Sequence, residues 1–431
     1  MKTLRLVVAT AVALGCVSAF ATNARVESMG KNSTFIMDDM SIFDNPANMN
    51  LYPNFLIGEL GNYLYPEGSV KVGENRDPRN PWFGGIFSLG IGAEKAISIG
   101  GVLGRRDERL LGLLPDYIKT ANGEIKTPEP VTNFDGFLGA NINNVALGAH
   151  IYIAHQDGLD GDNKINNGAF ASVWQLDIGT NIEISSRHAF ELSLGSARIQ
   201  YGPEEQDIFD PDLFSFFGRA RAFSKIDAIN GHLIPAASIF STSALGDREK
   251  MNLNLGIGVD AAFDRGFFWM GLNGFYDTEK AGLNWYKDTR GSIYEAPENL
   301  YSKDEQIISR LWQLGGTISF GIERNIWWDW FVIRVGGQKT VAYADYKSKS
   351  PSDKKSILCP SPSLDCPETG NYWVTNPVSD GTREDNVGFG FGVNIEEKLK
   401  VDATVAEDLL FRNPFQGGSR LMSRISATYS F

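Results

Sequence analysis

Histidine is the side chain best suited to move protons near neutral pH, so the histidines are the first candidates for a catalytic site. There are four: His150, His155, His188 and His232. Hydrolytic chemistry needs such a ring within hydrogen-bond distance of a Ser or an Asp. No local motif supplies that neighbour, and the sequence has no Gly-x-Ser-x-Gly segment. We therefore predict that the protein is not an enzyme.

The acidic stretch 157–163 has the spacing of half a calcium loop. Asp160 and Asp162 occupy alternate ligand positions, but Lys164 stands at the next one and the distal Glu is missing. The residues favour a solvated acidic loop instead. We predict no metal site and no cofactor.

Two arginines, Arg219 and Arg221, share one face of a predicted strand, because they alternate with Gly218, Ala220 and Ala222. Guanidinium groups at this spacing suit a carboxylate or another anion. Our hypothesis is therefore an anion-binding site at Arg219 and Arg221. The alternative is an ordinary polar face of mixed charge that keeps an interior hydrated.

The composition excludes several classes of protein. The 431 residues include 46 glycines, about 11% against roughly 7% in an average protein, and 12% are aromatic. Such an aromatic content is too high for a disordered chain. A formal net charge of −12 without a basic run argues against a nucleic-acid partner.

The first residues have the features of a cleaved export signal. Lys2 and Arg5 are followed by an apolar run, and Ala19-Phe20-Ala21 supplies the small residues of a cleavage site. The run is too short to span a membrane as a helix. We predict a signal peptide at 1–21 and export from the cytoplasm.

Two of the three cysteines, Cys359 and Cys366, lie close together in a Pro-rich stretch, whereas Cys16 belongs to the predicted signal. An even pair at short spacing in an exported chain predicts a disulfide that stiffens a loop.

The rest of the sequence alternates between apolar and polar residues in segments of about ten. The clearest are 251–263, 312–323 and 174–184. Such segments are typical of transmembrane β-barrels, and aromatic clusters such as 327–331 suit the membrane interface. A large secreted β-sandwich or propeller also alternates and is the alternative.

We predict sixteen strands, or fourteen if the ambiguous segment 202–231 forms a helix within a loop. The predicted strands lie near 55–63, 83–92, 96–104, 132–142, 145–155, 169–184, 189–201, 213–224, 231–243, 251–263, 267–277, 306–323, 328–344, 386–395, 398–406 and 418–431.

The predicted connections separate into two groups. Those at one end are brief, while the other end has the long connections 64–82, 105–131, 278–305 and 345–385. This asymmetry is that of outer-membrane barrels, whose periplasmic turns are short and whose external loops are long.

The long loops contain aromatic side chains. Exposed aromatics stack on sugars or on protein partners, or they pack among themselves and order the loop. These residues are Trp285, Tyr286, Tyr294, Tyr301, Tyr372 and Trp373.

The last strand ends in Tyr429 and Phe431 on its apolar face. A terminal aromatic preceded by another two residues back resembles the assembly signal of bacterial outer-membrane barrels. The resemblance implies that barrel assembly machinery and outer-membrane lipid are partners of this chain.

A polar, turn-rich segment, residues 22–50, precedes the first predicted strand; we call it the N-terminal segment. Its Asp-Asp-x-Ser and Asn-Pro-Ala motifs resemble those of the long-chain fatty acid transporter (FadL-type) outer-membrane superfamily. The resemblance implies that the segment folds into the barrel lumen as a hatch on the substrate path. The matching residues are Asp38, Asp39, Ser41, Asn45, Pro46 and Ala47; Asn48 stands where the family has glycine. A loose periplasmic tail is the alternative.

These observations together predict an all-β protein, a transmembrane antiparallel β-barrel of 14–16 strands with an N-terminal luminal plug. Its parts are the signal 1–21, the hatch 22–50 and the barrel 51–431. We expect a bacterial outer-membrane, porin-like protein that transports hydrophobic or amphipathic small molecules resembling long-chain fatty acids. The alternative is a surface or secretion-associated barrel that binds protein or polysaccharide partners through loops such as 278–305 and 345–385.

The glycine excess fits a plugged barrel. Glycines fall on the inward faces of predicted strands, as at Gly256, Gly258, Gly388, Gly390 and Gly392. Such small residues would leave room for a segment inside the lumen.

Overall fold

A computed structural model represents the chain. The structure describes residues 23–30, 32–60, 81–92, 95–114, 117–120, 123–128, 130–159, 165–203, 212–244, 248–281, 285–287, 293–295, 308–349, 369–374, 386–396, 398–405 and 422–431. The predicted signal peptide and the predicted disulfide pair Cys359 and Cys366 lie outside these residues.

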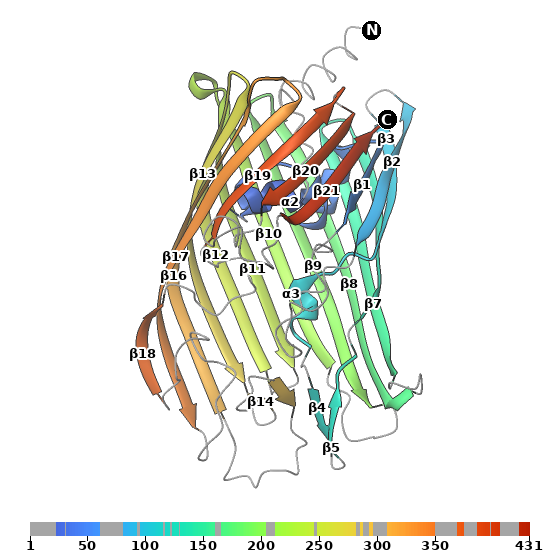
Figure 1. Ribbon diagram of the computed structural model, residues 1–431, viewed down its shortest axis with the longest axis vertical. Helices are drawn as coiled ribbons and strands as arrows, with labels where there is room; N and C mark the ends of the chain where they lie inside the picture. The colour runs from blue at the N-terminus through green and yellow to red at the C-terminus, as the bar shows by residue number, and fades with distance from the viewer. Residues whose placement is uncertain are drawn as a thin grey trace, which may run out of the picture.

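Sixteen antiparallel strands form one closed barrel, because the first strand pairs with both the second and the last (Figure 1). They are β1 (Phe55–Glu59), β2 (Trp82–Gly92), β3 (Lys95–Leu103), β6 (Thr132–Ile142), β7 (Val145–Leu159), β8 (Ile165–Ser185), β9 (His188–Pro203), β10 (Asp212–Ile226), β11 (Gly231–Ala244), β12 (Arg248–Phe263), β13 (Gly266–Ala281), β16 (Ile308–Asn325), β17 (Phe331–Lys349), β19 (Asn386–Ile395), β20 (Leu399–Val405) and β21 (Met422–Ser430).

All sixteen predicted strands are therefore present, and the all-β barrel is confirmed. The ambiguous segment contributes β10, which pairs along its length with β9 and β11. Sixteen is thus the strand count, not fourteen.

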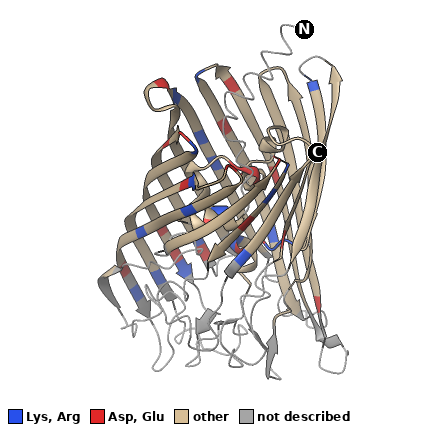
Figure 2. Ribbon diagram, turned by 45° about the horizontal axis from the view of Figure 1, so that its top comes forward, with Lys and Arg blue, Asp and Glu red and all other residues tan. Residues whose placement is uncertain are grey.

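The two faces of the wall differ as the alternation predicts. On β12, Leu255 points outward and is 71% exposed, whereas Asn252 and Asp260 point inward and are buried. The same division runs around the barrel, and Figure 2 shows residues of both charges spread along the strands. An apolar outer face of this extent is typical of a barrel wall that faces lipid.

Aromatic side chains mark one rim of the outer face. Trp327, Trp328 and Trp330 are exposed in the turn between β16 and β17, and the last two rings stack with centroids 5.0 Å apart. Amphipathic rings of this kind favour the headgroup depth of a bilayer. Among the helices of the described residues, none is long and apolar enough to cross a membrane.

The two ends of the barrel differ. The C-terminus lies at the end with the short turns (Figure 1). At the opposite end, β18 (Thr369–Val374) extends the wall beside β17. There the predicted long loops pair with each other, since a second sheet joins β4 (Tyr117–Thr120) and β5 (Gly123–Lys126) to β14 (Trp285–Lys287) and β15 (Ile293–Glu295).

The described helices are short. Four lie in the N-terminal segment, the fifth lies in the predicted outer loop 105–131, and the sixth lies in the turn between β10 and β11. They are α2 (Asn23–Ser28), η1 (Ser33–Phe35), η2 (Asp39–Phe43), η3 (Pro46–Asn50), α3 (Glu108–Leu111) and η4 (Asp227–Ile229).

Candidate functional site

The N-terminal segment contacts the inner wall on opposite sides of the barrel. The Thr404 hydroxyl of β20 donates to the carbonyl of Ala24 at 2.7 Å, and the Ser193 hydroxyl of β9 donates to the carbonyl of Asp44 at 2.7 Å. Most of its apolar side chains are buried, and Phe35 is completely so. These contacts attach the described residues of the segment to the wall; the luminal plug and its role as a hatch on a substrate path stay predictions.

The Asp-Asp-x-Ser motif holds the segment's own backbone. The Asp38 carboxylate accepts from the backbone N–H of Ser41 at 3.0 Å and so caps η2. Asp39 accepts from the hydroxyl of Thr428 on β21 at 2.9 Å. Asn48 donates to the Ser41 hydroxyl at 3.1 Å, which gives this departure from the family pattern a structural partner. The motif thus fixes a turn and attaches it to the wall.

The Asn-Pro-Ala motif begins the next helix in the same way. The Asn45 side chain accepts from the backbone N–H of Ala47 at 3.1 Å and donates to the carbonyl of Thr180 on β8 at 3.2 Å. Pro46 is the first residue of η3, where its missing N–H costs nothing. Asn45 therefore caps η3 and Pro46 begins it, and both residues lie against the wall.

Inward glycines form the seat of the segment, as the sequence predicts. A Cβ atom added at Gly258 would meet the ring of Phe35, and one added at Gly388 or Gly390 would meet Ser28. At Gly392 the crowding comes from the wall. A Cβ atom added there would meet Asp402 and Arg334, two residues of the wall itself.

A network of buried charges attaches α2 to the wall at β16, β17 and β20. Arg25 donates to both carboxylate oxygens of Glu323 at 2.6 and 2.8 Å. Arg334 donates to the same carboxylate at 3.0 Å and forms an ion pair with Asp402 at 2.7 Å. Two arginines and two acids thus cancel their charge, as buried charges must.

Arg219 and Arg221 point into the lumen, as predicted, and both contact the N-terminal segment. Arg219 forms an ion pair with Asp44. Arg221 forms one with Glu191 at 2.7 Å and donates to the carbonyls of Thr34 and Ile36. Anion binding by this pair stays a prediction; the carboxylates already beside them neutralise their charge.

The acids of the N-terminal segment have shifted pKa values. Burial raises the pKa of Asp38 to about 7, although Arg25 opposes the shift. Burial and the neighbouring Asp38 raise the pKa of Asp39 well above its usual range. For Asp44, burial is outweighed by Arg219 and Arg109, and its pKa is lowered. The segment therefore carries two acids whose protonated form is favoured, Asp38 and Asp39, and one whose charged form is favoured, Asp44.

A second element folds inward, and our sequence analysis did not predict it. The start of the predicted outer loop 105–131 forms α3, which lies between the N-terminal segment and the loop end of the barrel (Figure 1). Its Leu110, Leu111 and the following Leu113 are buried. The apolar run 110–114 in an otherwise polar loop was the signal that could have revealed it.

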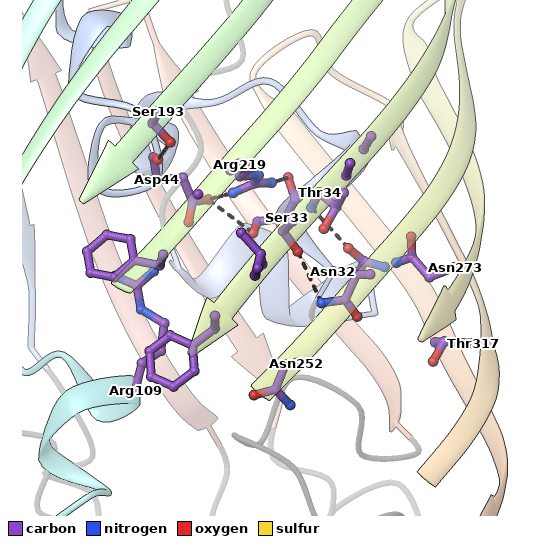
Figure 3. A pocket seen from close by; sticks show the side chains of 18 of the residues that line it. Asn32, Ser33, Thr34, Asp44, Arg109, Ser193, Arg219, Asn252, Asn273 and Thr317 are labelled. Carbon is purple, nitrogen blue, oxygen red and sulfur yellow. Dashed lines mark hydrogen bonds and ion pairs between the residues drawn. The ribbon is translucent and has the colours of Figure 1, made fainter. Parts of the chain in front are cut away.

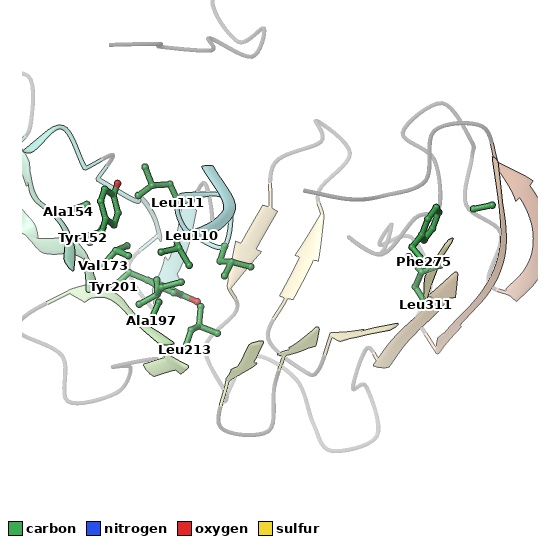
Figure 4. Packing of buried hydrophobic residues seen from close by; sticks show 14 of the residues in the cluster. Leu110, Leu111, Tyr152, Ala154, Val173, Ala197, Tyr201, Leu213, Phe275 and Leu311 are labelled. Carbon is green, nitrogen blue, oxygen red and sulfur yellow. The ribbon is translucent and has the colours of Figure 1, made fainter. Parts of the chain in front are cut away.

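These leucines cover an apolar patch on the inner wall, where polar residues are otherwise the rule (Figure 4). Tyr152, Val173 and Tyr201 belong to the patch, as do several residues of β8 to β10. Phe275 and Leu311 belong to the same group of buried residues, and Figure 4 shows them on the other side of the lumen. We call the leucines, the patch and these residues together the apolar cluster. It consists of Leu110, Leu111, Leu113, Tyr152, Ala154, Ala171, Val173, Ala197, Ile199, Tyr201, Leu213, Phe275, Leu311, Ala342 and Ala344.

His150 is buried on the inward face of β7. Its two ring nitrogens contact Asp177 at 2.6 Å and Asp135 at 2.9 Å. Arg105, just before α3, binds Asp135 through two nitrogens. The histidine therefore belongs to a chain of charges that attaches the base of α3 to the wall.

A cavity of about 190 Å³ lies between the N-terminal segment and α3. Ser33 and Asp44 line it on one side and Arg109 on another, while the wall contributes residues of β9 to β17 (Figure 3). None of the sequence motifs singled out these wall residues, because single polar positions on alternating strands look alike until the barrel closes.

Three further predictions concern the C-terminal residue, the loop aromatics and the calcium-like stretch. Phe431 packs on Phe87 of β2, with ring centroids 5.5 Å apart, so the last residue contacts the strand beyond the closure. Trp373 is 75% exposed and its ring lies against Tyr343. The calcium-like residues Asp160 and Asp162 lie outside the described residues.

No protein-family model matches this sequence, and no curated protein matches it. Solved structures do match. CdiB from Escherichia coli is 10% identical with a TM-score of 0.41, and the match covers 88% of this chain and 62% of that one. A FadL homologue from Pseudomonas aeruginosa is 14% identical with a TM-score of 0.37, covering 95% and 98%. The toluene transporter TodX from Pseudomonas putida is 12% identical with a TM-score of 0.34, covering 95% and 96%.

The chain thus spans about six tenths of the length of CdiB and nearly the whole length of the other two proteins. At 10–14% identity it is similar to a FadL homologue, to a toluene transporter and to CdiB.

Proposed function

We propose that this protein is a bacterial outer-membrane channel for hydrophobic or amphipathic small molecules. The observation that carries the proposal is the apolar cluster, because a lumen that conducted only water and ions would have no use for buried leucines, tyrosines and valines. An exposed apolar outer face supports a place in the membrane, and the predicted signal peptide supports export.

The two inward elements give such a channel an order of events. A solute would first displace α3 from the apolar cluster, since α3 lies nearer the loop end (Figure 1). It would then meet the N-terminal segment, which acts as the hatch through Asp38, Asp39, Ser41, Asn45, Pro46 and Ala47. The many polar contacts of that segment allow it to return to one docked position after each passage.

Uptake by cells tests this proposal. We expect expression of the protein to raise the initial uptake of radiolabelled dodecanoate and dodecanol several-fold, with glucose as the hydrophilic control solute. The double change Val173→Asn/Ile199→Asn makes the apolar cluster polar and should lower that uptake at least tenfold, since about 1.4 kcal/mol of lost binding is one factor of ten. Gln175→Asn is the matched control, because it keeps an inward polar residue on the same strand.

Two results would contradict the proposal. One is that the protein fails to raise uptake of either solute. The other is that glucose enters as readily as dodecanol and the double change affects neither.

A second candidate is a surface or secretion-associated barrel. The observation that favours it is the four-stranded sheet at the loop end, which orders parts of loops 105–131 and 278–305. In that case, deleting residues 285–295 should abolish the binding of a protein or polysaccharide to whole cells and leave dodecanol uptake unchanged. A transporter would show the reverse sensitivity at Val173 and Ile199.

A further inference from the structure

The cavity beside the apolar cluster is lined by groups that form neutral hydrogen bonds. Amides and hydroxyls together make up most of its polar side chains (Figure 3). Six of them, one on the N-terminal segment and five on four strands of the wall, line the cavity together. These groups are Asn32, Asn252, Asn254, Asn273, Thr317 and Gln338. Amides both donate and accept, so they match hydroxyl groups, which do the same.

The charges at this cavity cancel. Arg219 forms an ion pair with Asp44, and Arg109 forms one with Asp107 at 2.7 Å. Two positive and two negative groups leave no net charge at the cavity. An incoming carboxylate would have to displace one of the built-in acids, and the released acid would then be left buried and unpaired, which is unfavourable.

One buried amide atom points to a ligand. Asn252 is 4% exposed; its amide nitrogen donates to Asp277 at 2.9 Å, but its amide oxygen has no hydrogen-bond partner among the described residues. A buried polar oxygen without a partner costs about 1–3 kcal/mol. A hydroxyl donor in the cavity would remove that cost.

Size and position show how much of a solute the cavity can hold. Its volume of about 190 Å³ is below the roughly 300 Å³ of pockets that enclose a whole drug-sized ligand. The cavity adjoins the apolar cluster, because Phe217 and Phe240 line the cavity and also pack against that cluster. A head group therefore fits here while an apolar tail extends along the cluster.

We propose that this cavity binds the uncharged, hydroxyl-bearing head group of an amphipathic solute whose tail lies on the apolar cluster. The inference rests on the proposed channel function and names the solute class more narrowly: esters of glycerol, glycosides or long-chain alcohols rather than fatty acids. The amides select the head, and the apolar cluster binds the tail.

Equilibrium dialysis of the full chain in lipid nanodiscs tests the inference, with empty nanodiscs subtracted. The probes are radiolabelled monododecanoylglycerol and dodecanoate at pH 8, which share a tail and differ in the head. We expect the glycerol ester to bind at least tenfold more tightly than dodecanoate. Because this comparison uses the unaltered protein, it does not depend on whether any variant folds.

Two variants locate the effect. Asn252→Leu and Asn273→Leu should each weaken binding of the glycerol ester at least tenfold and change the binding of dodecanoate by less than twofold. Asn144→Leu, an exposed change in the turn after β6, is the matched control and should change neither.

The outcomes separate the inference from the channel function. The inference would be overturned if dodecanoate bound more tightly than the glycerol ester, or if the two variants weakened binding of both probes equally. In either case, uptake of dodecanoate or dodecanol by cells would still support the channel function. Failure of both binding and uptake would reject the channel function itself.

Discussion

Single residues in the lumen are arranged as matched pairs of charge. Arg25 and Glu323 are 2.6 Å apart, and Arg221 and Glu191 are 2.7 Å apart, with all four side chains almost completely buried. Removing one member of such a pair costs about 3–5 kcal/mol, because it leaves the other charge buried alone. The Arg25–Glu323 pair therefore defines the docked position of the N-terminal segment, whereas the Arg221–Glu191 pair joins two wall strands and orients Arg221 toward the carbonyls of Thr34 and Ile36.

Asp38 gives the docked segment a dependence on pH. Its folded pKa of about 7 lies above the unfolded value of about 3.9, so the folded chain holds the proton more tightly. The stabilisation from that proton is complete below about pH 4 and is lost as the pH rises to about 7. We expect Asp38→Asn, which can still accept the N–H of Ser41, to lose this dependence when thermal unfolding is measured from pH 4 to 8.

Asp44→Asn is the control of opposite sign. Its pKa is lowered, so its stabilisation is present at neutral pH and lost as the pH falls below about 4. A difference between the unaltered protein and Asp38→Asn that stays constant from pH 4 to 8 would contradict the assignment.

The N-terminal segment and α3 both pack against the inner face of the wall, and the shape of that face determines where they lie. The inward glycines of β12, β13 and β19 leave the space that the segment fills, and Phe35 is the largest side chain placed there. Period-2 alternation predicted those strands and those glycines. It did not predict α3, because whether a loop turns inward depends on an apolar patch assembled from strands distant in sequence.

The glycine seat makes a testable difference between two neighbouring strands. Gly258→Ala would place a methyl group against the ring of Phe35 and should lower the free energy of unfolding by about 1–3 kcal/mol. Gly274→Ala on β13 is the matched control, since the nearest atoms to its added Cβ lie at 3.9 Å and 4.0 Å. Urea unfolding in liposomes measures both.

A rescue variant completes this test. Phe35→Leu combined with Gly258→Ala should recover part of the loss, because the smaller side chain gives way to the methyl group. Equal losses at Gly258 and Gly274 would show that the segment does not seat on β12.

The whole molecule depends on the closure between β1 and β21. Only five residues of β1, Phe55–Glu59, pair with β21, and the same five pair with β2, so the two seams of β1 are the shortest among the described strands of the barrel. Phe431 strengthens the seam with β21 from outside the ladder, since its N–H donates to the carbonyl of Asn54 at 3.1 Å and its ring packs on Phe87.

Loss of the terminal residue should therefore reduce assembly. We expect deletion of Phe431 to lower the amount of folded, heat-modifiable barrel in the membrane several-fold, both through the lost contacts and through the predicted assembly signal with Tyr429. Phe431→Tyr, which keeps an aromatic ring at the seam, is the control. Normal yield after the deletion would remove the residue from any role in assembly.

By itself the sequence determined the strands, because alternation is a local property and each strand must present one face to lipid and one to the lumen. It also determined the two kinds of connection and the glycine positions. Only the tertiary structure decided which partners meet inside. Arg219 pairs with Asp44, and Leu110 joins the same cluster as Tyr152, only when the sixteen strands have closed in register. That register is a property of the whole sheet, so no segment of the sequence contains it alone.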